Sequence, residues 1–122
     1  MKIIFSLLLA LASGLAQAQY ASLLKDSVAQ RFDDEDLRMF LDAARQALHG
    51  APENETLKWQ NPKTRHGGEI TVLRNFQSEG RECKEVKVFN QAQGRKATNN
   101  FNLCEVDGKW RLVGASQLKK AK

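Results

Sequence analysis

The stretch from Cys83 to Cys104 constrains this chain most, because two independent patterns agree within it. Two strand-like runs flank Gln93 and Gly94, a pair of residues suited to a tight hairpin turn. A turn centred there fixes the antiparallel register and places Cys83 opposite Cys104. The same register puts the apolar residues on one face of the hairpin and the cysteines on the other. The sequence therefore predicts a cross-strand disulfide between these two residues.

Two further turns extend this hairpin into a sheet. Ser78–Gly80 fits a three-residue hairpin loop, and Asp107-Gly108 fits a two-residue turn before a last strand. Alternation around Leu57 and Trp59 predicts a first strand, which gives a five-stranded antiparallel meander. Its predicted inner face carries Ile70, Val72, Val86, Val88, Phe101, Leu103, Trp110 and Leu112.

Two helices are predicted before the sheet. Tyr20–Phe32 can form the first, and the acidic run Asp33–Asp36 begins a stronger one with apolar residues recurring on one face from Leu37 to Leu48. Acids at a helix N-terminus are favoured by capping and by the helix dipole. A calcium loop would need alternating oxygen ligands and a central glycine. Gly50 and Pro52 end the helix. The predicted fold class is α+β, with N-terminal helices packed on one face of the sheet.

The N-terminus has the pattern of a secretory signal peptide. Lys2 precedes the apolar run Ile3–Ala12, and small residues stand at Ala16 and Ala18. That run of about 10 apolar residues is shorter than the roughly 20 needed to span a bilayer. We expect cleavage between Ala18 and Gln19, and a soluble periplasmic or secreted product with no transmembrane anchor. The predicted parts are a signal peptide (1–18), a helical segment (19–55), the sheet (56–115) and a basic tail (116–122).

Composition narrows the partners. The formal net charge of +5 is modest and interleaved with acids, which favours loose attraction to anionic surfaces and no nucleic-acid binding. Two cysteines in an exported chain favour a disulfide. With only two histidines besides, the chain offers no zinc-ligand cluster, so no metal or cofactor is expected.

Three segments carry a resemblance to a known family. They read W-Q-N-P-K-T at 59–64, G-R-E-C-K-E at 80–85 and C-E-V-D-G-K-W at 104–110. In order and spacing they resemble the patterns W-x-N-P-x-T, G-R-x-C-R-E and C-x-x-x-D-G-x-W of the C-terminal domain of rickettsial-type seventeen-kilodalton surface antigens of proteobacterial envelopes. The resemblance covers about residues 41–113 and implies a small envelope or surface domain without an established catalytic role. The lipidation cysteine and glycine zipper common in that family have no counterpart in this sequence, so outer-membrane anchoring is not carried over.

No catalytic constellation is evident. His49 is predicted in the last helical turn, where a cationic side chain suits the dipole. His66 is predicted to be solvated in a turn, with no serine or free thiol nearby in sequence. We therefore expect a non-enzymatic protein. A hydrolase dependent on His66 is the least favoured hypothesis.

Two binding sites are predicted instead. The outer sheet face would expose Leu73, Lys87, Phe89, Arg111 and Val113, a mixed patch suited to docking an envelope protein, a cell-wall component or a host molecule. The other explanation for its apolar residues is that the predicted first helix covers them. The favoured function is an exported envelope interaction domain of a Gram-negative bacterium, with a secreted virulence-associated factor as one form of it.

The alternative function is a small inhibitor or regulator of a periplasmic or host hydrolase. Such a protein would present a protruding loop, and the turn at 61–68, with Lys63, Arg65 and His66, is the candidate.

Overall fold

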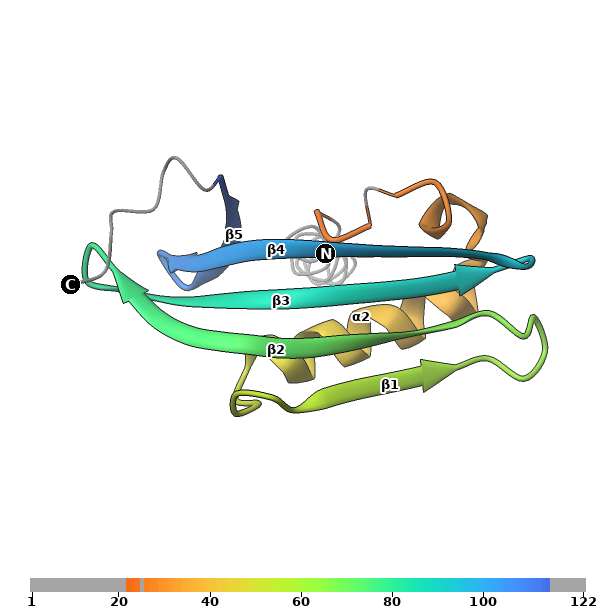
Figure 1. The fold of residues 1–122 in the computed structure, drawn as a ribbon, viewed down its shortest axis with the longest axis horizontal. Helices are drawn as coiled ribbons and strands as arrows, with labels where there is room; N and C mark the ends of the chain where they lie inside the picture. The colour runs from red at the N-terminus through yellow and green to blue at the C-terminus, as the bar shows by residue number, and fades with distance from the viewer. Residues whose placement is uncertain (1–21, 25, 115–122) are drawn as a thin grey trace, which may run out of the picture.

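The computed structural model describes residues 22–24 and 26–114. The predicted signal peptide, its cleavage site and the basic tail lie outside the described residues. The described part has one α-helix, one 3-10 turn and a five-stranded antiparallel sheet in the order β1-β2-β3-β4-β5, which confirms the α+β class and the meander (Figure 1). The strands are β1 (Thr56–Gln60), β2 (Gly67–Ser78), β3 (Arg81–Ala92), β4 (Arg95–Val106) and β5 (Lys109–Val113).

The central hairpin of β3 and β4 has the predicted register. Cys83 pairs with Cys104, and the two residues form a disulfide. Gln93 and Gly94 both have positive φ, 53° and 78°, as the tight turn of a twisted hairpin requires. The turn at Asp107 likewise confirms the predicted pairing of β4 with β5.

The loop between β2 and β3 differs from the prediction. Ser78 pairs directly with Arg81, so the turn contains two residues, Glu79 and Gly80, and not three. Both adopt positive φ, 53° and 74°. Glutamate tolerates this conformation poorly, so sequence pattern alone favoured the longer loop.

A bulge in β2 compensates for the shorter turn. The register shifts between Val72 and Arg74, which leaves Leu73 as the extra residue. Val72 therefore still faces Val86, as predicted, but every residue of β2 beyond the bulge changes face. Arg74, predicted on the inner face, instead pairs with Glu85 in an outer-face row.

The acidic run begins the helix as expected. Helix α2 (Asp34–Leu48) has Asp33 as its N-cap, and Asp33 and Asp36 form a reciprocal capping box. His49 is the C-cap residue, and its backbone N–H donates to the Arg45 carbonyl. The helix packs on the inner face over β1 and β2, so its buried side chains, among them Phe40, join those of the sheet in one core (Figure 1).

The segment before α2 is not the predicted α-helix. Its described part contains only the 3-10 turn η1 (Ala29–Arg31). Asp26 Oδ1 accepts a hydrogen bond of 2.6 Å from the Ala29 backbone N–H, and such local side-chain bonds compete with helix formation. Leu23, Val28 and Phe32 are buried in the same core as α2. This segment therefore covers the inner face, and it is not the predicted cover of the outer face.

Burial on the inner face follows the predicted alternation. Ile70, Val72, Val86, Val88, Leu103 and Trp110 are buried, whereas Phe101 and Leu112 are only half-buried. Both half-buried residues lie on β4 and β5, away from the strands that α2 covers. The sheet is thus packed tightly at β1–β3 and more loosely toward β5.

Candidate functional site

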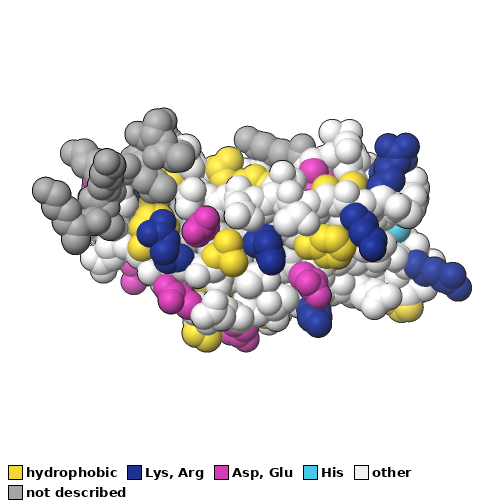
Figure 2. Space-filling model, in the orientation of Figure 1, with side chains coloured by type: hydrophobic (Ala, Val, Ile, Leu, Met, Phe, Trp, Pro, Cys, Tyr) yellow, Lys and Arg dark blue, Asp and Glu magenta, His cyan; other side chains and the backbone are white. Residues whose placement is uncertain are grey.

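The outer face of the sheet is the largest surface that the described residues leave uncovered. Figure 2 views this face and shows apolar side chains alternating with lysine, arginine and acidic side chains along it. Leu73, Phe89 and Val113 are half-buried, and Lys87 and Arg111 are exposed, so all five predicted residues reach the surface.

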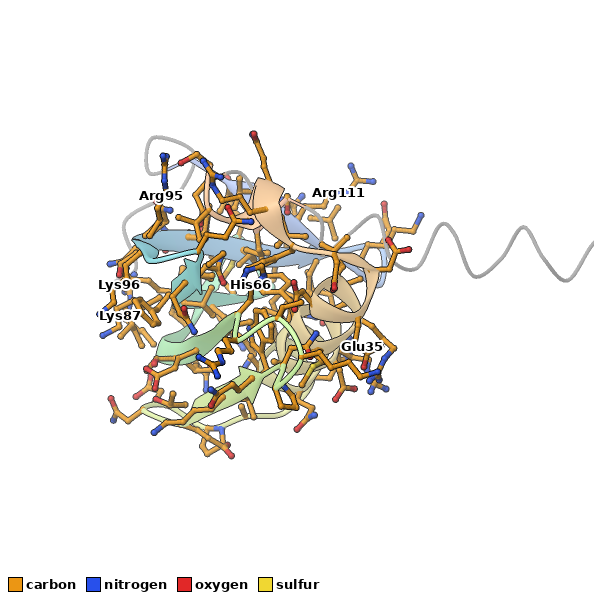
Figure 3. The ribbon with its side chains drawn as sticks, turned by 90° about the vertical axis from the view of Figure 1, so that its right-hand side faces the viewer. Glu35, His66, Lys87, Arg95, Lys96 and Arg111 are labelled. Carbon is orange, nitrogen blue, oxygen red and sulfur yellow. A yellow bond between two sulfur atoms is a disulfide. The ribbon has the colours of Figure 1, made fainter. Side chains whose placement is uncertain are left out.

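The register divides these five residues into two groups. Lys87 pairs with Asn100 at the centre of the face, and Phe89 lies two residues further along the same strand. Arg111 pairs with Cys104, at the disulfide end of β4. Strand twist turns this end away, and Figure 3 shows Lys87 and Arg111 on different sides of the molecule. We call Leu73, Lys87 and Phe89 the central patch. Arg111 and Val113 lie outside it.

Ion pairs neutralise only part of the charge on this face. Lys58 lies 3.6 Å from Glu69, and Arg74 lies 3.7 Å from Glu85. Lys87 has no carboxylate within ion-pair distance among the described residues. Lys96, which pairs with Gln91 on the same face, has none there either (Figure 3). The centre of the face therefore carries a net positive charge.

The predicted binding loop is tied to the helix by a buried carboxylate. Asp36 is 0% exposed. Its Oδ1 accepts hydrogen bonds from Asn61 Nδ2 at 2.9 Å and Thr64 Oγ1 at 2.8 Å. Its Oδ2 accepts from the Asp33 backbone N–H at 2.9 Å and from His66 Nδ1 at 2.8 Å. Four donors thus satisfy one buried charge. We call these residues the Asp36 latch.

The latch sets the ionisation state of Asp36. Burial on its own raises the pKa of this carboxyl. The hydrogen bonds from Asp33, His66, Thr64 and Asn61 outweigh burial and leave the pKa below its ordinary 3.8. An ionised carboxylate can only accept, so Nδ1 of His66 carries the hydrogen that lies between the two side chains.

His66 is buried, not solvated as the sequence suggested. It is 7% exposed, and its ring centroid lies 6.1 Å from that of Phe32. The carboxylate–imidazole pair resembles the base and orienting group of a catalytic triad. Both cysteines are in the disulfide, so the described residues provide no thiol nucleophile, and burial closes the ring to a substrate. The pair therefore has a structural role.

The rest of the loop is compact and displays two cations. The Arg65 backbone N–H donates to the Asn61 carbonyl at 2.8 Å, and Gln91 Nε2 donates to the Arg65 carbonyl at 2.9 Å. Lys63 and Arg65 are exposed. Of the three residues predicted for this loop, only these two can contact a partner.

Sequence reasoning missed the latch, although a signal for it was present. Asn61 and Thr64 are the polar residues of the N-P-x-T run, which strand alternation does not explain. Asp36 was assigned to capping alone. It also makes three further side-chain contacts, with residues at least 25 positions away in the chain.

The glycine pair after the loop was also missed. A Cβ at Gly68 would lie 2.5 Å from the Phe89 carbonyl oxygen and 2.7 Å from Trp59 Nε1. The buried indole of Trp59 therefore packs directly on the backbone of β2, where no side chain fits. Gly67-Gly68 serves this packing and not ligand binding.

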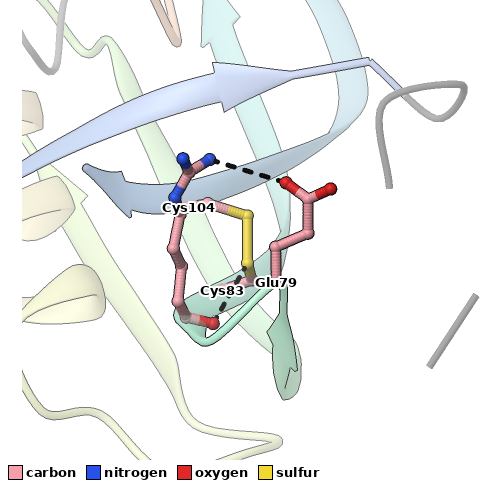
Figure 4. Close-up of a disulfide and its surroundings, with 4 residues drawn as sticks. Glu79, Cys83 and Cys104 are labelled. Carbon is pink, nitrogen blue, oxygen red and sulfur yellow. Dashed lines mark hydrogen bonds and ion pairs between the residues drawn. A yellow bond between two sulfur atoms is a disulfide. The ribbon is translucent and has the colours of Figure 1, made fainter. Parts of the chain in front are cut away.

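The disulfide closes the opposite end of the sheet. Cys83 and Cys104 are 2% and 3% exposed. Arg81 and Glu79, in the adjoining turn, approach to 4.0 Å beside it (Figure 4). The staple is shielded from solvent, as a structural disulfide should be.

Two further searches of the described residues gave negative results. They contain no group of three or more histidine, cysteine, aspartate or glutamate side chains placed to hold a metal ion. None of their helices is long and apolar enough to cross a membrane.

Comparison with known families identifies this architecture. A sequence profile described as "17 kDa outer membrane surface antigen" matches residues 46–111, more than half of the chain. The chain belongs to this family. No curated protein and no solved structure gives a significant match.

The surface antigen match confirms the resemblance drawn from the three segments, and it indicates an exported, envelope-type protein. The matched region contains the disulfide and the loop residues Asn61, Thr64 and His66. Asp36 precedes it. The latch therefore ties the antigen-family region to the helix N-terminus that comes before it.

Proposed function

We propose that this chain is a non-enzymatic, exported envelope protein that binds another envelope protein through the central patch. One observation carries the proposal. Leu73, Lys87 and Phe89 lie on a sheet face that no described element covers. The 17 kDa surface antigen family supports the envelope setting.

The chemistry of the patch supports a protein partner with an acidic rim. A half-buried aromatic side chain such as Phe89 can be buried further on contact, and aromatic residues dominate the energetics of many interfaces. Lys87 and Lys96 lack carboxylate partners among the described residues, so they favour an acidic surface opposite them. An ion pair formed there would add mainly to specificity and association rate.

The test is capture of the partner from envelopes of the native host by the purified, oxidised protein. Phe89→Glu should abolish capture, because it places a desolvated carboxylate at the centre of the interface. Gln46→Glu, on the exposed side of α2, is the control and should capture as the unsubstituted protein does. Circular dichroism should show that both variants remain folded. Equal capture by Phe89→Glu would refute the proposed surface.

Export and its destination are measured separately. Intact mass of the protein from periplasm and medium, with and without reductant, should give a chain that begins at Gln19 with the disulfide formed. A predominantly extracellular fraction would support a secreted factor with a role in virulence. A purely periplasmic fraction would restrict the partner to the periplasm. An uncleaved N-terminus in both fractions would contradict export by the signal peptide.

A hydrolase inhibitor is the second candidate, and the latched loop favours it. Asp36 holds the loop rigidly while Lys63 and Arg65 stay exposed, and such preorganisation lowers the entropic cost of binding. Lys63→Ala combined with Arg65→Ala should remove inhibition of a hydrolase panel and leave capture through the central patch unchanged. His66 must not be altered in this test, because it belongs to the latch.

A further inference from the structure

A surface pocket of about 430 Å³ lies near the disulfide, between the loop that follows α2 and the inner face of β2 and β3. Pro52 contributes from the loop, and Trp110 contributes an aromatic wall from β5. Its volume lies within the usual range for small-molecule sites. The central patch is on the other face of the sheet, so this pocket is independent of the proposed function.

The bulge at Leu73 sets the polar side chains of the pocket. Because the register shifts there, Asn75 pairs with Lys84 and Gln77 pairs with Glu82. Lys84 and Glu82 lie in phase with Val86 on the inner face. Without the bulge, Arg74 and not Asn75 would face inward beside Lys84. The chain thus places an amide next to a buried lysine.

Lys84 is a buried cation with neutral partners only. It is 8% exposed, and its Nζ donates to Asn75 Oδ1 at 2.8 Å and to the Ala51 carbonyl oxygen at 3.2 Å. An ammonium has three N–H donors, so one remains. Among the described residues no carboxylate lies within ion-pair distance of Lys84. Burial lowers its pKa, and the charge of Glu82 only partly opposes this.

A structural explanation accounts for part of this arrangement. Ala51 follows the C-terminal end of α2, where a cation is favoured by the helix dipole. That dipole provides only a partial negative charge. Glu53, the nearby carboxylate of the same loop, accepts from the Asn75 backbone N–H at 2.8 Å. Lys84 therefore still lacks a full counter-charge within the described structure.

We propose that the pocket binds a small carboxylate carried on an apolar body. The remaining N–H of Lys84 and the Nδ2 of Asn75, whose Oδ1 is already engaged, supply donors for the two carboxylate oxygens. The apolar part lies against Trp110. The C-terminal end of a peptide and a fatty acid share this chemistry, and the experiment distinguishes them.

The experiment titrates the purified, oxidised protein with matched pairs of probes, followed by nuclear magnetic resonance of the amide and indole N–H groups. Acetyl-alanyl-phenylalanine stands for a peptide end and octanoate for a fatty acid. The corresponding amides are the neutral controls. We expect saturable shifts at Asn75, Lys84 and Trp110 with the acids only, and the tighter acid identifies the source.

Three variants test the role assigned to Lys84. Lys84→Met should weaken binding of the acid by about tenfold or more, and Lys84→Arg should retain most of it, because arginine also binds carboxylates. Glu82→Gln should tighten binding by a few-fold, because it removes a like charge from the pocket. A cation-binding pocket would give the opposite response to Glu82→Gln.

Three results would overturn the proposal. They are no saturable shift with either acid, equal binding of an acid and its amide, and unchanged affinity in Lys84→Met. Should Lys84→Met fail to fold, the Glu82→Gln and Lys84→Arg variants with the amide controls still decide the question.

Discussion

The two ends of the inner sheet face each hold a buried charge, and the structure treats the two charges differently. Asp36, at the end of the β1–β2 loop, accepts four hydrogen bonds and is fully buried. Lys84, at the disulfide end, has two neutral acceptors and borders a pocket. A buried charge with every hydrogen-bonding position filled holds a fold together. A buried charge left with a spare donor at a pocket is available to a ligand.

This contrast also separates two ways of stabilising a small sheet. The loop end depends on a polar network that joins α2 to the sheet. The opposite end depends on the covalent link between Cys83 and Cys104. Removing either should be costly, whereas removing the charge of Lys84 should not be. The following predictions test that order.

The largest effect is expected from Asp36→Ala. It leaves Asn61, Thr64 and His66 buried without their acceptor and removes half of the capping box, so the free energy of unfolding should fall by about 3–5 kcal/mol. Urea denaturation measures this. Asp42→Ala is the matched control, because that aspartate is on the same helix in a largely exposed pair with Arg45 and should cost less than about 1 kcal/mol. Similar losses in both variants would show that the latch carries no special stability.

Loss of the disulfide should cost less than loss of Asp36. Its cysteines are 21 positions apart, and closing a loop of about this length stabilises a protein by about 3 kcal/mol. Cys83→Ser combined with Cys104→Ser should therefore lower the free energy of unfolding by about 3 kcal/mol. Hydrogen exchange should show the loss concentrated in β3–β5, with the latch still protected. Uniform loss of protection would mean that the two ends do not stabilise the fold separately.

Acid should selectively weaken the loop end. The folded-state pKa of Asp36 lies below the ordinary 3.8, so its stabilising contribution is fully present above pH 3.8 and is lost as the pH falls through the folded-state value. The difference in unfolding free energy between the unsubstituted protein and Asp36→Ala should therefore stay constant from pH 6 to about 5 and shrink below pH 4. Glu35 and Asp42 titrate in both proteins, so their effects cancel. A difference that grows on acidification would contradict the assigned ionisation.

Much of the sheet could be predicted from the sequence because period-two alternation and turn residues act locally. Gln93-Gly94 and Asp107-Gly108 fixed two registers correctly. The β2–β3 connection was partly wrong. A two-residue turn with a bulge at Leu73 and a three-residue loop without one give the same pairing of Val72 with Val86. Alternation before the bulge cannot distinguish these two solutions.

The sites were harder to predict, because each depends on contacts between distant segments. Asp36 reads as an ordinary helix cap until the fold brings the N-P-x-T loop to it. Lys84 reads as an ordinary polar residue of an alternating strand until the end of α2 buries it. The first helix was predicted from apolar spacing, which a buried irregular segment capped by Asp26 also satisfies.

The smallest effect is expected from Lys84→Met, and it sharpens the comparison most. Replacing a buried, incompletely paired cation by an apolar side chain of similar length removes a desolvation penalty as well as two hydrogen bonds, so the free energy of unfolding should change by less than about 1 kcal/mol. The same variant should lose binding of apolar carboxylates. Stability retained together with binding lost would separate the role of Lys84 from that of Asp36. A loss approaching that of Asp36→Ala would instead make Lys84 a second structural tie, in which its bond to the Ala51 carbonyl holds the end of α2 against the sheet.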